Sequence, residues 1–225
     1  MKPSFKIKKT MDKNYWDNFY KNHAKDSNLS KHSSFALFCL DKSFIKENQN
    51  IVEIGCGNGR DAIFFARNKL NVHALDQSVS VIKENMNLID ERYQKYLNLR
   101  EADFVTENYQ EYKNINVFYS RFTIHSITKN EESILLPKIY NTLENDGVLC
   151  IEVRTTKDPL YGIGDKIDKN TYVNNNHTRR FIDSQEFLSE SFSIGFKLLY
   201  FTEENNLSVH NNDNPVLMRI VLQKG

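Results

Sequence analysis

The stretch IVEIGCGNGRDAIFFA, residues 51–66, places three glycines within five positions directly after a short apolar run. A segment with helical spacing of apolar residues, 60–69, follows at once. A strand that turns sharply into a helix needs residues that can adopt unusual backbone dihedral angles, and glycine supplies them. Such a turn exposes backbone N–H groups and a helix N-terminus, so we expect it to hold a ligand. A tight turn without a ligand is the alternative interpretation.

Apolar runs and helical segments alternate along the rest of the chain, which predicts an α/β fold with a doubly wound, mostly parallel sheet. The last two strands are joined only by a loop and are expected to form an antiparallel pair at the sheet edge. Residues 170–183 are polar and are expected to be a loop, and Pro137 is expected to kink its helix. We expect strands at 51–54, 71–76, 97–100, 116–122, 147–154, 195–203 and 215–223, and helices at 60–69, 80–97, 131–143 and 185–192.

The composition is that of an ordinary globular protein, with 225 residues, 40% hydrophobic residues and a formal net charge of +1. We expect a single domain over 1–225, with an N-terminal helical cap at 1–48 and a core at 49–225. The near-neutral charge favours neither nucleic acid nor a membrane surface, and no apolar run is long enough to span a bilayer. Three cysteines without a C-x-x-C pair predict a cytoplasmic protein without disulfides or a metal site.

The spacing of the glycines, G-x-G-x-G, differs from the G-x-G-x-x-G that is typical of dinucleotide sites. Glu53 precedes the turn by two residues, and its carboxylate would repel a pyrophosphate but attract an ammonium group. These two features together favour a ligand with a cationic or amino-acid end. A nicotinamide-binding reductase is therefore a disfavoured alternative.

Acidic residues follow the second and third expected strands. Asp76 ends the second strand, where a carboxylate can accept hydrogen bonds from both hydroxyls of a ribose. Asp103 follows the third strand and could accept a hydrogen bond from an adenine amine, while Phe104 could pack against the ring.

These motifs resemble those of the class I S-adenosylmethionine-dependent methyltransferases, from about residue 51 to the C-terminus. VEIGCGNGRDAIFFA is similar to the family's glycine-rich first motif, ALDQS to its acidic second motif and READF to its third. The resemblance implies a Rossmann-like seven-stranded sheet of order 3-2-1-4-5-7-6, with the seventh strand antiparallel. It also implies that S-adenosylmethionine is the cofactor, with its methionine part near Glu53, Gly55, Gly57 and Asn58, its ribose at Asp76 and Gln77, and its adenine at Asp103 and Phe104.

The resemblance further implies that the loops after the fourth and fifth strands choose the methyl acceptor. The Asn/Asp-Pro-Pro-aromatic motif of nucleic-acid base N-methyltransferases is absent from the fourth-strand region, which disfavours that substrate class. Cations instead gather after these strands and suggest a site for a small anionic molecule. Pairing of some arginines with structural carboxylates such as Glu152 or Asp183 is the alternative. The candidate acceptor residues are Arg121, Arg154, Tyr161, His177, Arg179 and Arg180.

His125 is the candidate general base, because histidine titrates near neutral pH. Packing of its side chain against the core is an equally weighted interpretation. Tyr15 and Tyr20 are candidates for an aromatic lid over the site, although packing of their helix against the domain is the more usual role.

The segments YSRFTIHSI (119–127), VRTTKDPLYG (153–162) and RRFID (179–183), with NYWDNFY (14–20), also resemble small methyltransferases of bacterial surface-polysaccharide gene sets. Some of these are suspected to make O-methyl groups on sugars or on the phosphoramidate groups of capsules. The resulting hypothesis is O-methylation of a small anionic metabolite in surface-polysaccharide biosynthesis. Alternatives are a methyltransferase for a thiol or a metalloid oxyanion, and a partner subunit that binds S-adenosylmethionine without activity.

Overall fold

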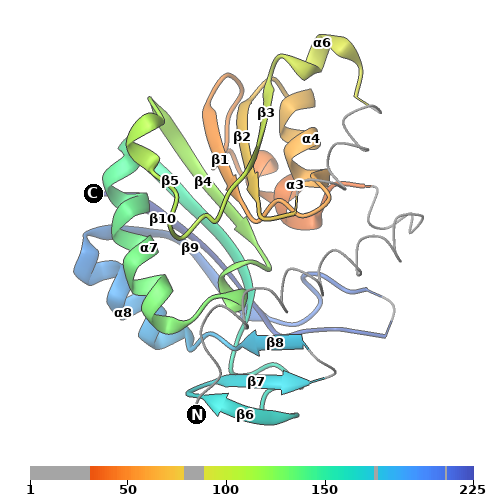
Figure 1. The fold of residues 1–225 in the computed structure, drawn as a ribbon, viewed down its shortest axis with the longest axis vertical. Coiled ribbons are helices and arrows are strands. Elements are labelled where there is room, and N and C mark those ends of the chain that lie inside the picture. The colour runs from red at the N-terminus through yellow and green to blue at the C-terminus, as the bar shows by residue number, and fades with distance from the viewer. Residues whose placement is uncertain (1–30, 79–88, 175–176, 211) are drawn as a thin grey trace.

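The computed structural model describes residues 31–78, 89–174, 177–210 and 212–225. Their centre is a seven-stranded sheet of order β3-β2-β1-β4-β5-β10-β9 (Figure 1), which confirms the predicted topology because β9 and β10 are its sixth and seventh strands along the chain. β10 is antiparallel to both of its neighbours, and the other neighbouring strands are parallel. The strands are β1 (Asn50–Ile54), β2 (Asn71–Asp76), β3 (Leu97–Glu101), β4 (Ile115–Arg121), β5 (Leu143–Arg154), β9 (Phe196–Glu204) and β10 (Leu217–Lys224).

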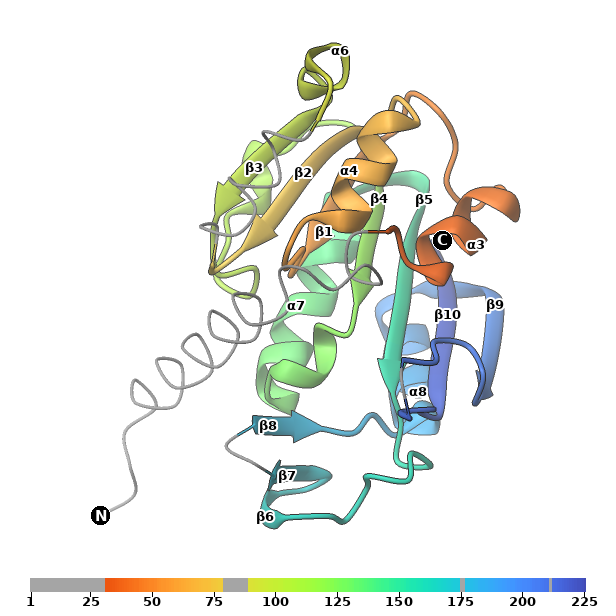
Figure 2. The ribbon, with the colours of Figure 1, turned by 90° about the vertical axis from the view of Figure 1, so that its right-hand side faces the viewer.

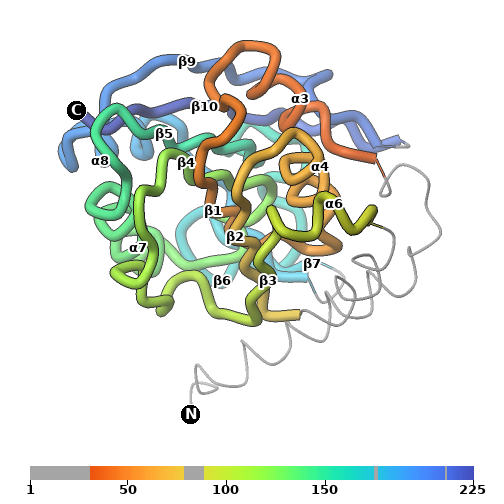
Figure 3. The backbone as a smooth tube through the Cα atoms, turned by 90° about the horizontal axis from the view of Figure 1, so that it is seen from above, coloured from red at the N-terminus to blue at the C-terminus, as the bar shows by residue number. Residues whose placement is uncertain are grey.

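Helices cover both faces of this sheet, with α7 and α8 on one face and α3 and α4 on the other (Figure 3). Thr128 and Glu131 form a capping box that begins α7, and Gly195, at φ +115°, ends α8. The helices are α3 (Ser34–Asp41), α4 (Arg60–Arg67), α6 (Glu91–Gln94), α7 (Lys129–Thr142) and α8 (Ser184–Ile194), with the 3₁₀ turns η1 (Tyr109–Glu111) and η2 (Ile124–Ser126).

The two apolar layers arise from the alternation of side chains along the strands. In β4, Phe118 belongs to the cluster under α7 and α8, whereas Val117 and Tyr119 belong to the cluster under α3 and α4. In β1, Val52 and Ile51 divide in the same way. Because both faces are buried, the central strands are almost continuously apolar, as parallel sheets require.

A second, three-stranded antiparallel sheet of order β6-β7-β8 lies beyond the carboxyl end of β5 (Figure 2). The expectation of a loop at 170–183 is therefore wrong. The polar composition of this segment hides the β-forming Thr171 and Val173 and the aromatic contact between the mostly buried Tyr172 and Phe181. The strands are β6 (Asp165–Asp168), β7 (Thr171–Asn174) and β8 (His177–Arg180).

Three further expectations concern the helices and the N-terminal cap. α7 continues as one helix through Pro137. The helix expected at 80–97 is described only from residue 89 onward, where the structure contains α6. Residues 80–88 lie outside the described part of the chain. Of the cap expected at 1–48, residues 31–48 are described and contain α3. No helix within the described parts of the chain is both long and apolar enough to cross a membrane.

Candidate active site

The glycine turn between β1 and α4 is fixed to the end of β2. The backbone N–H groups of Gly55 and Cys56 donate to the carbonyl oxygen of Leu75, at 2.8 and 3.0 Å. Gly55, Gly57 and Gly59 have φ angles of +68°, +56° and +76°. These left-handed conformations strain any residue with a β-carbon, so the turn requires its glycines.

Asp76 joins the glycine turn to the loop after β2. Its Oδ2 accepts a hydrogen bond from the Gly57 N–H at 2.9 Å, and its Oδ1 accepts one from the Ser78 N–H at 2.8 Å. Both carboxylate oxygens are thereby held in fixed directions at the carboxyl edge of the sheet.

Glu53 lies beneath the turn with 4% of its surface exposed. Its Oε2 is buried and has no hydrogen-bond partner among the described residues. Burial raises the pKa of this carboxyl well above its usual value, and the negative charges of Asp61 and Asp76 raise it further, while Arg60 opposes them. A buried carboxyl group with a partnerless oxygen fits a cationic group of a ligand, because the cation would stabilise its ionised form.

The loop after β3 supplies Asp103 and Phe104. Asp103 Oδ1 accepts a hydrogen bond from the Val105 N–H at 3.1 Å, which fixes its side chain. Phe104 is buried in the cluster under α7, and its carbonyl oxygen accepts a hydrogen bond from the Tyr109 hydroxyl at 2.7 Å. An acid and an apolar ring therefore stand side by side at this edge.

One cavity of about 790 Å³ joins the predicted cofactor residues to the predicted acceptor residues. Gly57 does not line the cavity, but its N–H donates to Asp76, which does line it. The lining includes Glu53, Gly55, Asn58, Asp76, Gln77, Asp103 and Phe104 and, on the acceptor side, Arg121, His125, Arg154, Arg179 and Arg180.

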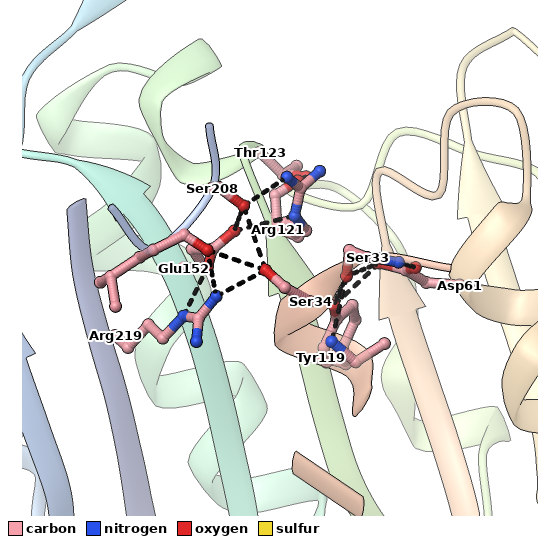
Figure 4. A network of polar contacts seen from close by, with 11 residues as sticks. Ser33, Ser34, Asp61, Tyr119, Arg121, Thr123, Glu152, Ser208 and Arg219 are labelled. Carbon is pink, nitrogen blue, oxygen red and sulfur yellow. Dashed lines mark hydrogen bonds and ion pairs between the residues drawn. The ribbon is translucent and has the colours of Figure 1, made fainter. Parts of the chain in front are cut away.

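Asp61, in the first turn of α4, was not predicted and also lines the cavity. Its buried carboxylate accepts three hydrogen bonds, from the Ser33 N–H at 2.6 Å, the Ser33 hydroxyl at 2.7 Å and the Tyr119 hydroxyl at 2.8 Å (Figure 4). This carboxylate therefore connects α4 to the start of α3 and to β4. An acid among the apolar residues of 61–66 was the signal that could have identified it.

Arg121 is held by Glu152, which is wholly buried. Glu152 Oε1 accepts from Arg121 Nε at 2.8 Å and from the Ser208 hydroxyl at 3.1 Å, and its Oε2 accepts from Arg219 Nε at 2.6 Å (Figure 4). Arg219 Nη2 also donates to the Ser34 hydroxyl at 2.8 Å. The network ties the loop before β10 to β4, β5 and α3. Arg121 is therefore paired with a structural carboxylate, which was the alternative to a free cation at an anion site.

Arg154 is likewise paired. Its Nη1 donates to Asp158 Oδ2 at 2.9 Å, and its Nη2 bonds to Asp213. Asp183, which was considered as a partner for an arginine, instead caps the N-terminus of α8 by accepting two backbone N–H groups.

Arg180 holds the η2 turn in place. Its Nε donates to the carbonyl oxygen of Ile127 at 2.9 Å, and its Nη2 donates to that of Ile124 at 3.3 Å. The same nitrogen bonds to Oε2 of the buried Glu132 at 2.5 Å. The arginine charge is compensated, and the turn that carries His125 is clamped on both sides.

His125 and His177 are buried with their ring centroids 6.4 Å apart. His125 lines the cavity, and neither ring nitrogen has a hydrogen-bond partner among the described residues. Burial lowers the pKa of His125 well below its usual value, and the positive charge of Arg179 lowers it further. Burial and Arg179 also lower the pKa of His177 to about 4, although His177 is not part of the lining.

Phe122 follows β4 in the left-handed region, at φ +54°, which is costly for an aromatic residue. Its N–H donates to the carbonyl oxygen of Glu152 at 2.9 Å. The Arg121 guanidinium lies 4.4 Å from the centre of its ring, and the His125 ring lies 5.9 Å away. Phe122 therefore joins the ion-paired Arg121 to the histidine on the cavity wall.

The structure does not bring Tyr161 to the cavity. Tyr161 is 37% exposed and is not part of the cavity lining; its hydroxyl donates to Asn170 Oδ1 at 2.9 Å. Tyr15 and Tyr20 lie outside the described residues. Within the described ranges, no group of three or more His, Cys, Asp and Glu side chains could hold a metal ion.

A family model described as a methyltransferase domain matches residues 45–204. A probable (S)-tetrahydroprotoberberine N-methyltransferase of Papaver bracteatum is 23% identical over 136 residues, which are 60% of this chain and 37% of the relative. This chain thus spans little more than a third of the length of that relative.

Solved structures with a similar fold include the glycopeptide N-methyltransferase MtfA, with a TM-score of 0.66 and 13% identity over 87% of this chain and 97% of that one. Another is the 1,6-didemethyltoxoflavin-N1-methyltransferase of Burkholderia thailandensis, solved with S-adenosylhomocysteine, with a TM-score of 0.69 and 13% identity over 93% and 87% of the chains. At these identities the likeness shows a shared fold.

Proposed function

This chain belongs to the methyltransferase domain family, and from that premise we propose that it transfers a methyl group from S-adenosylmethionine to an oxygen of a small anionic metabolite. S-adenosylmethionine supplies an activated sulfonium methyl group, so the protein's task is mainly to align the acceptor for in-line displacement.

The observation that carries the donor assignment is the buried, partnerless Oε2 of Glu53 beneath the glycine turn. In our proposal, Glu53 receives the ammonium end of the donor, Asp76 receives the ribose hydroxyls, and Asp103 with Phe104 receives the adenine. The chemistry of this set fits the donor, because it offers a carboxylate to the cation and an apolar ring to the base. The cavity, at about 790 Å³, lies in the size range of about 300–1,000 Å³ that is usual for ligand pockets.

The preference for an anionic acceptor rests on the charges that act on His125. Arg179, Arg154 and Arg180 each lower its pKa and line the cavity, so cationic side chains gather near this ring, although Arg121, Arg154 and Arg180 are ion-paired. A positive field favours an acceptor that carries negative charge.

Methylation of nitrogen, of a thiol or of a metalloid oxyanion remains a competing outcome, as does donor binding without activity. The resemblance to methyltransferases of surface-polysaccharide gene sets is the reason to include phosphorylated and phosphoramidate-bearing sugars among the candidate acceptors.

Binding of S-adenosylhomocysteine, measured by titration calorimetry, tests the donor site. We expect Asp76→Ala to weaken binding by about 10- to 100-fold, which corresponds to the loss of about 1–3 kcal/mol of charge-assisted hydrogen bonding. Glu101→Ala is the matched control, because Glu101 pairs in register with Asp76 on the neighbouring strand but is exposed and not part of the cavity lining. No binding to the wild-type chain, or equal loss in both variants, would contradict the assignment.

Transfer of a labelled methyl group tests the acceptor. The full chain is incubated with labelled S-adenosylmethionine and matched acceptors that carry a carboxylate, a phosphate, a hydroxyl, an amine or a thiol. We expect the label in the oxygen-bearing anions. Label in the amine alone would assign the protein to the N-methyltransferases, and tight donor binding without any transfer would favour a partner subunit.

A further inference from the structure

We propose that the methylated atom is an oxygen that is already ionised when the acceptor binds, and that His125 holds this oxyanion as a neutral hydrogen-bond donor rather than removing a proton. The inference rests on the proposed methyltransferase function and adds the chemical class of the acceptor group, namely a carboxylate or a phosphate-type oxygen.

The first observation is the position of the ring. His125 lies on η2, 3% exposed, and borders the cavity. Both of its nitrogens are buried without a hydrogen-bond partner among the described residues. Burying a polar group without a hydrogen-bond partner costs free energy, so we infer that this ring forms its hydrogen bond with a bound ligand. Arg180 prevents the turn from moving away, because it binds the carbonyl oxygens of Ile124 and Ile127 on either side.

The second observation is the kind of charge that surrounds the ring. η2 packs against β8 and β5. β8 brings His177, Arg179 and Arg180, and β5 brings Arg154. The three arginine charges disfavour a positive imidazolium at His125, and the neighbouring His177, whose own pKa is lowered to about 4, adds no negative charge to favour one.

The third observation is that the carboxylates near these elements are engaged elsewhere. Glu132 bonds to Arg180 and to Lys129, and Asp158 and Asp213 bond to Arg154. Glu131 accepts from the Thr128 N–H and hydroxyl in the capping box of α7. A histidine that acts as a general base needs an acid or another acceptor to orient it and to stabilise its charged form, and none of the described residues bonds to this ring.

It follows that the imidazole stays neutral and carries one N–H donor and one acceptor nitrogen. A neutral N–H donor orients an oxyanion but stabilises it less than a cation would, since charge-assisted hydrogen bonds in which both groups are ionised are stronger. The attacking oxygen therefore keeps its nucleophilicity, and the arginine charges act on it from a distance.

The proposed step balances without a proton. A lone pair of the acceptor oxygen forms the new O–CH₃ bond as the S–CH₃ bond breaks, and the electron pair of that bond stays on sulfur. The oxyanion loses its charge on methylation, the sulfonium becomes the neutral thioether of S-adenosylhomocysteine, and the product is a methyl ester. No general base takes part.

The test uses the full chain loaded with S-adenosylhomocysteine and inorganic phosphate or acetate as the probe, measured by calorimetry. We compare His125→Gln, which keeps a donor but is no base, with His125→Leu, which keeps neither. Phosphate binding is expected to persist within about threefold in the glutamine variant and to weaken about tenfold in the leucine variant, the value of one hydrogen bond to an anion. Arg179→Met should also weaken it, whereas Lys166→Met, an exposed charge on β6 outside the lining, should not.

The protonation state provides a second readout. Nitrogen-15 chemical shifts of the His125 imidazole should report a neutral ring at pH 6 in the phosphate complex. For a substrate found by methyl transfer, kcat should be independent of pH from about 6 to 9, and it should be higher in His125→Gln, which keeps a donor, than in His125→Leu.

The outcomes separate the two proposals. Binding of S-adenosylhomocysteine without binding of phosphate or acetate would overturn the present inference alone, as would an imidazolium at pH 6. Turnover of a neutral alcohol that is lost in His125→Gln would also overturn it. Failure to bind S-adenosylhomocysteine would instead overturn the proposed function.

Discussion

Thr123 occupies the space that a side chain on Gly55 would need. A β-carbon built on Gly55 would lie 2.5 Å from Thr123 Oγ1, and the glycine backbone has a φ of +68°. The glycine turn after β1 and the loop after β4 are therefore in close contact, which joins the proposed donor side of the cavity to the proposed acceptor side.

Gly55→Ala should disrupt both the fold and the donor site. The left-handed conformation and the clash with Thr123 together predict a loss of about 2–5 kcal/mol in the free energy of unfolding. We also expect binding of S-adenosylhomocysteine to fall below detection, since relief of the clash must move the turn. Urea denaturation and calorimetry on the same preparation measure the two effects.

Gly162→Ala is the matched control for that substitution. Gly162 also has a positive φ, +84°, but a β-carbon there would meet no atom within 4 Å. The substitution then costs only the strain of a left-handed backbone, so we expect the free energy of unfolding to fall by about 1–2 kcal/mol. The affinity for S-adenosylhomocysteine should be unchanged. Equal effects at the two positions would show that the contact with Thr123 contributes nothing.

Asp61→Asn should destabilise the start of α3. The amide of asparagine has a single oxygen and two donor hydrogens, so it cannot accept all the bonds now given by Ser33 and Tyr119. We expect a loss of about 2–4 kcal/mol in the free energy of unfolding, because buried donors are left without partners. Asp165→Asn, on the exposed edge strand β6, is the control and should change stability by less than about 0.5 kcal/mol.

The strand order, and the meeting of Glu53, Asp76 and Asp103 at one cavity, could be predicted because their signals are local. The glycines, Glu53 and Asp76 stand next to strand ends in the sequence, and the edge of a parallel sheet brings strand ends together. The apolar runs that mark the strands are equally local, since burial on both faces leaves little choice of side chain.

The acceptor side could be predicted only in part because its geometry depends on contacts between distant segments. Arg219 and Glu152 are 67 residues apart in the sequence, and no pattern near Glu152 predicts that they pair. The predicted arginines Arg121, Arg154, Arg179 and Arg180 line the cavity. Their charge partners lie on other elements: Arg154 bonds to Asp213 before β10, and Arg180 bonds to Glu132 on α7. The small sheet was missed because Tyr172 and Phe181 are buried by one another rather than by a periodic apolar face.

Glu152→Gln should be among the most damaging substitutions in the core. The change leaves Arg121 and Arg219 without their carboxylate in a buried site, and breaking a buried ion pair in this way costs about 3–5 kcal/mol. Urea denaturation should record this loss. Glu203→Gln offers the comparison, since the ion pair that it removes is with the exposed Lys157, and the glutamine oxygen can still accept from the Ser184 hydroxyl. A Glu152→Gln variant as stable as the wild type would show that the two arginines find other partners.

Glu53→Gln should stabilise the ligand-free protein while it destroys donor binding. Burial raises the pKa of Glu53 in the folded state above its unfolded value, so the folded state holds a proton that the unfolded state has lost over the interval between the two. The free energy of unfolding then falls as pH rises through that interval, by up to about 1.4 kcal/mol per pH unit. Glutamine does not titrate, so the variant should lack this fall and have the higher Tm above neutral pH, with the difference shrinking toward the unfolded pKa. Thermal denaturation from pH 4.5 to 8.5, with and without S-adenosylhomocysteine, measures both effects: the ligand should raise the Tm of the wild type and leave the variant unchanged. A variant less stable than the wild type at pH 8 would mean that the carboxylate is satisfied in the folded protein and is not reserved for a cation.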